Sequence, residues 1–145
     1  MKRLIAITTV AAALLLGGTA HAVSNGPALV KLDCEVQNQN PVGQQLCYQL
    51  RESVARSASF REVYQAPAFV MHVVSLDPTP DDNGHAAAYS LTITVQYGEK
   101  LPEYFMTAYV GVTGASRVQE TAQSLMATLS EQKQILAAST SVTSK

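Results

Sequence analysis

The 145-residue sequence contains no tryptophan, only two cysteines and only three histidines, and charged residues make up 14% of the chain. Apart from Lys2 and Arg3, the basic residues are scattered singly, so the concentrated positive charge that contacts phosphate backbones is missing. We therefore expect no nucleic-acid partner. The glycine spacings match neither a phosphate-binding loop nor a dinucleotide fingerprint. Without a motif for chemistry, we predict no catalytic residues, no cofactor and no metal ion, and hence no enzyme.

The one long hydrophobic run lies at the N-terminus. The stretch "MKRLIAITTVAAALLLGGTAHA" begins with two cations, continues with apolar residues and ends with Ala20-His21-Ala22. This pattern predicts a secretory signal peptide over residues 1–22, cleaved between Ala22 and Val23. An uncleaved anchor is the alternative, but the apolar run is shorter than the roughly 20 residues that span a bilayer. No cysteine follows the run, so we expect no lipoprotein attachment.

Export determines what the mature chain should be. Removing 22 residues from 145 leaves 123, a usual length for one domain. We predict a single domain over residues 23–136 and a flexible polar tail over residues 137–145. Two of the ten basic residues leave with the leader, so eight remain against eleven acidic ones, a formal charge of −3. The expected location is the periplasm, or alternatively the medium, without stable membrane insertion after cleavage.

We interpret Cys34 and Cys47 as a disulfide, because an exported chain with an even number of cysteines enters an oxidising compartment. A redox pair of the thioredoxin type needs cysteines two residues apart, and a structural zinc site needs ligand pairs at short spacing. Closing a loop of about 14 residues would stabilise the fold by roughly 3 kcal/mol. The disulfide is therefore the favoured interpretation over a redox or zinc site.

The first half of the mature chain predicts a strand followed by a helix. Apolar and polar residues alternate over Ala28–Val36, which is typical of a strand with one buried face. Asn40 and Pro41 are suited to begin a helix, as an amide cap followed by proline at the first helical position. Apolar residues then recur every four positions, which predicts a helix from Pro41 to about Ser57. Residues 59–65 are a candidate edge strand.

The second half predicts three strands, within residues 67–77, 88–97 and 103–113, and a second helix. The first of these strands is apolar on both alternating faces and is expected to be covered on both sides. A capping box at Ser116 begins the helix, whose apolar stripe extends to Leu136. Consecutive strands joined by short loops pair antiparallel. We predict an α+β two-layer sandwich: a mainly antiparallel sheet of three to four strands, with two amphipathic helices on one face, in the order β-α-β-β-β-α.

His72 and His85 are the remaining candidates for chemistry. Nothing next to His72 in the sequence supplies a nucleophile or a carboxylate for acid–base work. His85 follows Asp77, Asp81 and Asp82, but their spacing does not match a calcium loop, and turn chemistry explains these residues. A small periplasmic enzyme that uses His72 or His85 is kept as an alternative.

The candidate interaction surface lies on the last two predicted strands. A strictly alternating hydroxyl face is either solvated sheet, which is the favoured interpretation, or a docking surface, and the aromatic residues of the last strand are the other candidate surface. Our leading hypothesis is a small exported, non-enzymatic interaction or binding protein of the cell envelope, partnered by another envelope protein. The alternative is an inhibitor or immunity protein that neutralises an envelope-directed toxin or hydrolase. The surface residues are Ser90, Thr92, Thr94, Gln96, Tyr104, Phe105 and Tyr109.

Overall fold

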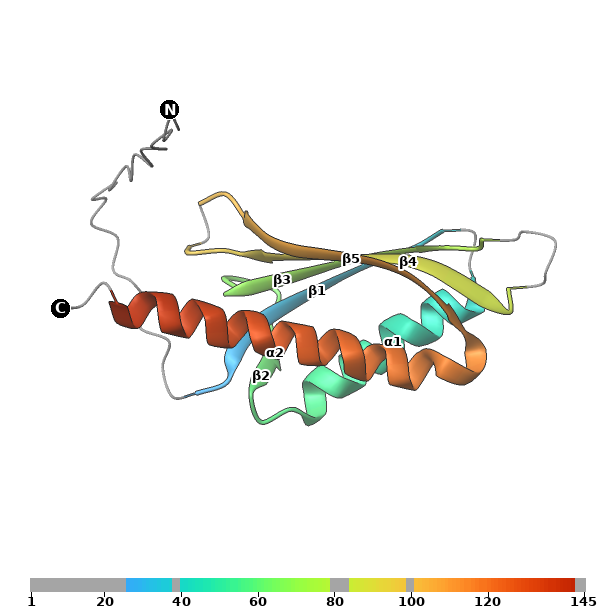
Figure 1. The fold of residues 1–145 in the computed structure, drawn as a ribbon, viewed down its shortest axis with the longest axis horizontal. Helices are drawn as coiled ribbons and strands as arrows, with labels where there is room; N and C mark the ends of the chain where they lie inside the picture. Colours follow the sequence, from blue (N-terminus) through green and yellow to red (C-terminus); the bar gives the residue numbers. More distant parts are fainter. Residues whose placement is uncertain (1–25, 38–39, 79–83, 99–100, 143–145) are drawn as a thin grey trace, which may run out of the picture.

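The computed structural model describes residues 26–37, 40–78, 84–98 and 101–142. The predicted signal peptide and its cleavage point between Ala22 and Val23 lie outside these residues, as do Asp81 and Asp82. Five strands form one sheet, and two long helices lie against the same face of it, which gives two layers (Figure 1). The predicted α+β class is confirmed.

The sheet is mixed, with the strand order β2-β1-β3-β4-β5. β1 pairs in parallel with both β2 and β3, whereas β4 pairs antiparallel with β3 and β5. The prediction of three to four mainly antiparallel strands in the order β-α-β-β-β-α is therefore wrong. The five strands are β1 (Ala28–Val36), β2 (Phe60–Glu62), β3 (Phe69–Leu76), β4 (Ala86–Val95) and β5 (Tyr104–Gly114).

Two features of the chain explain this error. β2 lies within the candidate edge strand of residues 59–65 and is an edge of the sheet, but its three residues are too few for alternation to count it firmly among the strands. In addition, helix α1 (Pro41–Arg56) carries the chain back along β1, so that β2 and β3, which pair with β1, run parallel to it. The rule that consecutive strands pair antiparallel holds only for β3, β4 and β5, which are joined by short connections.

Helix α1 begins at the predicted cap, Asn40. The Asn40 Oδ1 accepts a hydrogen bond from the backbone N–H of Gly43 at 2.7 Å, and Nδ2 donates to the carbonyl oxygen of Ala86, also at 2.7 Å. Asn40 is buried, so one side chain both caps the helix and fixes its N-terminus to β4. The buried side of the helix carries Val42, Gly43, Leu46, Cys47, Leu50 and Val54.

Helix α2 (Val118–Val142) follows a short 3-10 helix, η2 (Ala115–Arg117), and lies beside α1 (Figure 1). It extends past Leu136, at which the sequence analysis ended the domain. Near its C-terminal end, Ile135 is 57% exposed and does not belong to the buried side of the helix. The stripe that does pack on the core is formed by Val118, Ala122, Leu125 and Leu129.

Cys34 of β1 and Cys47 of α1 are joined by a disulfide, with their Cα atoms 6.2 Å apart. The predicted pairing is confirmed. The bridge ties the first strand to the first helix beside the core, and it indicates an oxidising compartment. Within the described ranges, neither helix is both long enough and apolar enough to cross a membrane.

Candidate functional site

Among the described residues, no helix covers the face of the sheet opposite α1 and α2 (Figure 1), and we call this side the open face. Residues in register on neighbouring strands share a face, so the open face can be read across the sheet. It is charged on β1, small and polar on β4, and apolar on β5. Its members are Lys31, Asp33 and Glu35 of β1; Val70, His72, Val74 and Leu76 of β3; Ala88, Ser90, Thr92 and Thr94 of β4; and Phe105, Ala108, Val110 and Val112 of β5.

The expectation that β3 is covered on both sides is only partly correct. On the open face, Val70 is completely buried, whereas Leu76 at the other end of the strand is 40% exposed. The difference arises because the loop Tyr64–Pro67, which joins β2 to β3 over β1, lies near Val70 and not near Leu76. The loop therefore covers the open face of β3 at the Val70 end, whereas the Leu76 end has no such cover among the described residues.

The predicted hydroxyl face of β4 belongs to the open face. Ser90 and Thr92 are half-buried there. Thr94 is only 8% exposed, so it is not part of a solvated surface. Gln96 lies just beyond the strand, and its Nε2 donates to the carbonyl oxygen of Leu101 at 3.3 Å.

The three predicted aromatic residues of β5 divide between the two faces. Phe105 is in register with Thr94 on the open face and is 68% exposed. Tyr104 and Tyr109 are in register with β4 residues that face the helices, and they are 49% and 41% exposed. A register shift leaves Met106 unpaired, and such a bulge reverses the alternation that the sequence pattern assumed.

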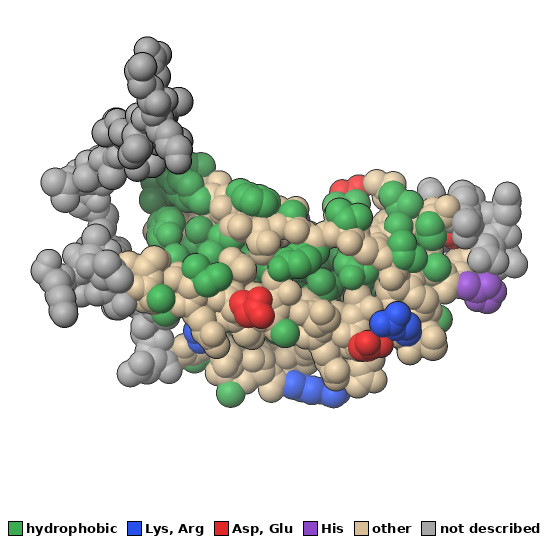
Figure 2. Space-filling model, viewed as in Figure 1, with side chains coloured by type: hydrophobic (Ala, Val, Ile, Leu, Met, Phe, Trp, Pro, Cys, Tyr) green, Lys and Arg blue, Asp and Glu red, His purple; other side chains and the backbone are tan. Residues whose placement is uncertain are grey.

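Two residues that the sequence analysis did not single out, Val110 and Val112, are 85% and 67% exposed on the open face. Figure 2 shows hydrophobic side chains gathered in a band at the level of β5, with several charged side chains nearer the helices. The signal for these valines was present in the apolar composition of the strand. To predict that these valines are exposed, one must know that β5 lies at the edge of the described sheet, and alternation alone does not show which strand is the edge.

The charged side of the open face holds a chain of polar contacts centred on His72. Its Nε2 lies 2.8 Å from Glu103 Oε2, and its Nδ1 lies 3.7 Å from Asp33 Oδ2. Lys31 Nζ donates to Asp33 Oδ2 at 2.9 Å, and Thr94 Oγ1 donates to Glu103 Oε2 at 2.6 Å. These partners of His72 were not predicted from the sequence, because the parallel pairing of β1 with β3 is what places Asp33 beside it.

These contacts determine the charges of the network. The hydrogen bond from Thr94, followed by the one with His72, lowers the pKa of Glu103 from its ordinary value. The hydrogen bond with Asp33 raises the pKa of Lys31. Both groups are therefore ionised at neutral pH. About a third of each side chain is exposed, so solvent screens the resulting attractions.

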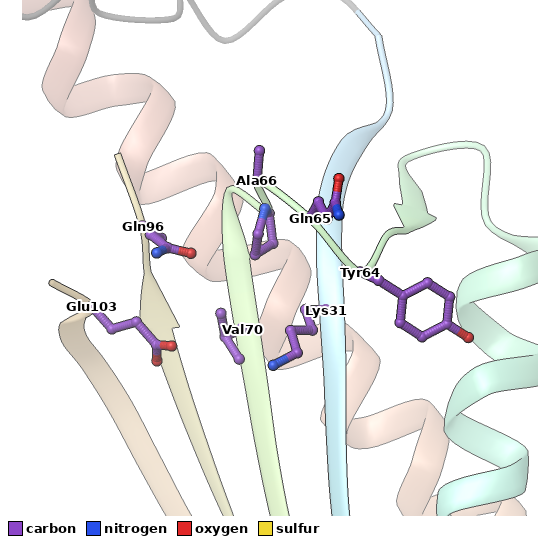
Figure 3. Close-up of a pocket in the computed structure, with 8 residues that line it drawn as sticks. Lys31, Tyr64, Gln65, Ala66, Val70, Gln96 and Glu103 are labelled. Atoms are coloured by element: carbon purple, nitrogen blue, oxygen red, sulfur yellow. The ribbon is translucent and has the colours of Figure 1, made fainter. Parts of the chain in front are cut away.

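A shallow pocket of about 470 Å³ lies next to this network. Val70 forms its base, and the loop Tyr64–Pro67 forms one wall. In Figure 3 the charged ends of Lys31 and Glu103 reach toward each other across Val70, whereas the Tyr64 ring points away. Both charged groups already have partners within the protein, so neither requires a ligand to neutralise it.

His85 is exposed and lies directly before β4, apart from the His72 network. The described residues contain no group of three or more His, Cys, Asp or Glu side chains that could hold a metal ion. Of the residues weighed as a metal site from the sequence, Asp77 and His85 are described, while Asp81 and Asp82 are not.

The fold is a two-layer α+β sandwich with a mixed five-stranded sheet. Among solved structures, it is similar to a dodecamer of PelC from Paraburkholderia phytofirmans, at 18% sequence identity and a TM-score of 0.40, covering 75% of this chain and 87% of that chain. This likeness concerns the fold alone, and no residue is carried over from it. No protein-family model and no curated protein matches the chain.

Proposed function

We propose that this chain is a small exported, non-enzymatic interaction protein of the cell envelope, which binds another envelope protein through the β5 side of its open face. The observation that carries the proposal is the exposure of Phe105, Val110 and Val112, each at least 67% exposed on one strand. Contiguous apolar surface of this kind on a folded domain is typical of protein interaction sites.

The proposed compartment is the periplasm. The disulfide between Cys34 and Cys47 supports an oxidising location. The sequence of residues 1–22, with its cations, apolar run and small terminal residues, supports export by a cleaved signal peptide. The two observations are independent, because one concerns the leader and the other the folded domain.

The surroundings of His72 support a function without catalysis. Its Nε2 is hydrogen-bonded to the Glu103 carboxylate at 2.8 Å, and its Nδ1 lies 3.7 Å from Asp33 Oδ2, which is an ion-pair contact and not a hydrogen bond. These contacts fit a structural role for His72 between neighbouring strands. The Thr94 hydroxyl donates to the Glu103 carboxylate, and the lowered pKa of Glu103 makes it a weaker base than an ordinary carboxylate. The network is suited to hold β1, β3 and the start of β5 together.

The charge pattern of the open face indicates what the partner should offer. Apolar side chains of the partner would lie over β5, where Val110 and Val112 are exposed. Over β1, the carboxylates of Asp33 and Glu35 outnumber the ammonium of Lys31, so basic side chains are favoured on that side. An amphipathic segment with apolar and basic sides fits both requirements.

Site-specific photo-crosslinking in cells that naturally export the chain tests this proposal. A photoreactive amino acid in place of Val112 should give an adduct with one envelope protein. The same amino acid in place of Tyr48, which is 59% exposed on the helix side, is the matched control and should not give that adduct. Identical adducts at both positions, or none at Val112, would contradict the proposal.

A further inference from the structure

The two edges of the sheet differ in how they are protected. β2 has three residues, and side chains from both helices cover it. Arg51 Nε lies 3.7 Å from Glu62 Oε1, and Lys133 Nζ donates to the carbonyl oxygen of Ser59 at 3.1 Å. Lys133 Nζ also lies 5.5 Å from the centre of the Phe60 ring. Charged side chains and short length are the usual means by which an edge strand avoids pairing.

β5 has none of this protection. It is 11 residues long, carries no charged side chain between Tyr104 and Gly114, and is the last strand in the sheet of described residues (Figure 1). A long, uncharged edge presents backbone N–H and C=O groups to another extended strand. The chemistry of this edge therefore selects a β-strand as its partner, independently of what binds the open face.

The side chains of β5 are arranged for pairing with an identical strand. We propose that two copies of this chain pair antiparallel through β5, about a two-fold axis at Val110, so that two five-stranded sheets become one of ten strands. Antiparallel pairing about this residue places Tyr109 opposite the partner's Gly111 and Ala108 opposite the partner's Val112. Val110 lies opposite its own copy at the axis, and on either side of it the larger side chain of each named pair meets a small one, which suits close packing between strands.

Gly111 already has a role within one chain, because the Tyr89 ring lies where a Cβ atom would be, and the proposed register keeps this glycine free of further crowding from a large residue of its own. A Cβ atom at Gly111 would lie 2.7 Å from the Tyr89 hydroxyl oxygen, so the ring of Tyr89 already covers the glycine from the β4 side. The partner's Tyr109 would cover it from the other side, because Tyr109 and Gly111 face the same layer. An axis at Tyr109 would instead place the two tyrosines directly opposite each other.

A second copy fits this edge for a further reason. Pairing of β5 with the β2 edge of another copy would be a head-to-tail contact that builds rings or open filaments, and the length and charges of β2 oppose it. Pairing of β5 with itself closes after two copies. Because the strand is uncharged, no like charges meet across the axis. The open face remains accessible in the pair, so this inference goes beyond the proposed function and does not compete with it.

Cysteine cross-linking of the exported chain tests the axis. In a Val110→Cys variant, the two introduced thiols lie on opposed residues about 4.5 to 5.5 Å apart between Cα atoms, within disulfide range. Mild oxidation should therefore convert most of the protein to a covalent dimer. Val112→Cys is the matched control, since its counterpart would lie four positions further along the strand, at roughly 13 Å, and it should stay unlinked.

The mass of the uncross-linked protein, measured by light scattering or sedimentation, is the second readout. We expect a dimer for the natural sequence and for Tyr64→Lys, which adds a charge at an 84% exposed site away from β5. Val110→Lys places like charges opposite each other and should raise the dissociation constant by about tenfold or more. Cross-linking at Val112 rather than Val110, or at neither, overturns the axis at Val110. A monomeric mass overturns the pairing altogether, while an envelope-protein adduct at Val112 in that monomer would leave the proposed function intact.

Discussion

The two faces of the sheet differ in how deeply their side chains are buried. On the covered face of β4, Ala87, Leu91 and Ile93 are completely buried beneath the helices. On the open face of the same strand, Ser90 and Thr92 are half-buried. Alternating residue types along one strand therefore reflect what packs against each face of the sheet. Burial stabilises the fold mainly on the covered face.

The open face of β5 does not follow this division. Val110 and Val112 are apolar but exposed, so they contribute little to the stability of the single chain. An apolar residue that is not needed for folding has to be explained by something else, and association is the explanation that the position at a sheet edge favours. The difference between the faces therefore separates residues that hold the domain together from residues available to a partner.

The largest expected effect comes from the covered face. Leu91→Ala removes a completely buried side chain and should lower the free energy of unfolding by about 3 kcal/mol, through lost burial and the cavity left behind. Val112→Ala, at 67% exposure on the open face, should change it by less than about 0.5 kcal/mol. Urea denaturation measures both. Equal losses would mean that the open face is buried in the folded chain.

The disulfide adds a constraint at the edge of the covered face. Replacing Cys34 and Cys47 together by alanine should cost about 3 kcal/mol, because the unfolded chain regains the freedom of the closed loop. Adding a reductant to the natural protein should lower its urea midpoint to about that of the double variant. The reductant should not change the midpoint of the double variant itself. A reductant that also shifted the double variant would contradict this assignment.

The polar network of the open face should contribute less, and only above acidic pH. Because the pKa of Glu103 in the folded chain lies below its ordinary value of 4.5, its stabilisation is present above that pH and is lost as pH falls through the folded pKa. With a third of the side chain exposed, the loss should be about 1 kcal/mol or less. Glu103→Gln should remove this part of the pH dependence of the urea midpoint.

Thr94→Val separates the two causes of that shift. It removes the hydroxyl that makes the larger contribution to lowering the Glu103 pKa and leaves the contact with His72. The carboxyl titration, followed by NMR, should then move up toward the ordinary value without reaching it. A titration that did not move would show that Thr94 is not a partner of Glu103.

Local chemistry made part of this structure predictable. Asn40 and Pro41 predicted the start of α1, and the two cysteines predicted the disulfide. Both predictions were possible because a helix cap and an oxidised cysteine pair depend on few neighbours. The parallel pairing of β1 with β3 depends on the whole chain, so the contact of Asp33 with His72 was invisible in the sequence. The unpaired Met106 likewise changed which face Phe105 occupies. The features that were predicted depend on local residue types, whereas those that were missed depend on how strands far apart in the sequence pair.

The smallest effect should come from the polar exception on the covered face. Ser75 is completely buried, and its Oγ has no hydrogen-bond partner among the described residues. It lies against Gly43 of α1, where an added Cβ would overlap its hydroxyl, so the helix approaches β3 closely at this point. An unpaired buried hydroxyl costs free energy, and Ser75→Ala should therefore raise the free energy of unfolding by about 0.5 kcal/mol.

Ser90→Ala, the same change on the open face, should have no measurable effect, because water can bond the Ser90 hydroxyl. Denaturation of the two variants side by side compares the faces most directly, and a loss of stability in Ser75→Ala would mean that a buried water satisfies that hydroxyl.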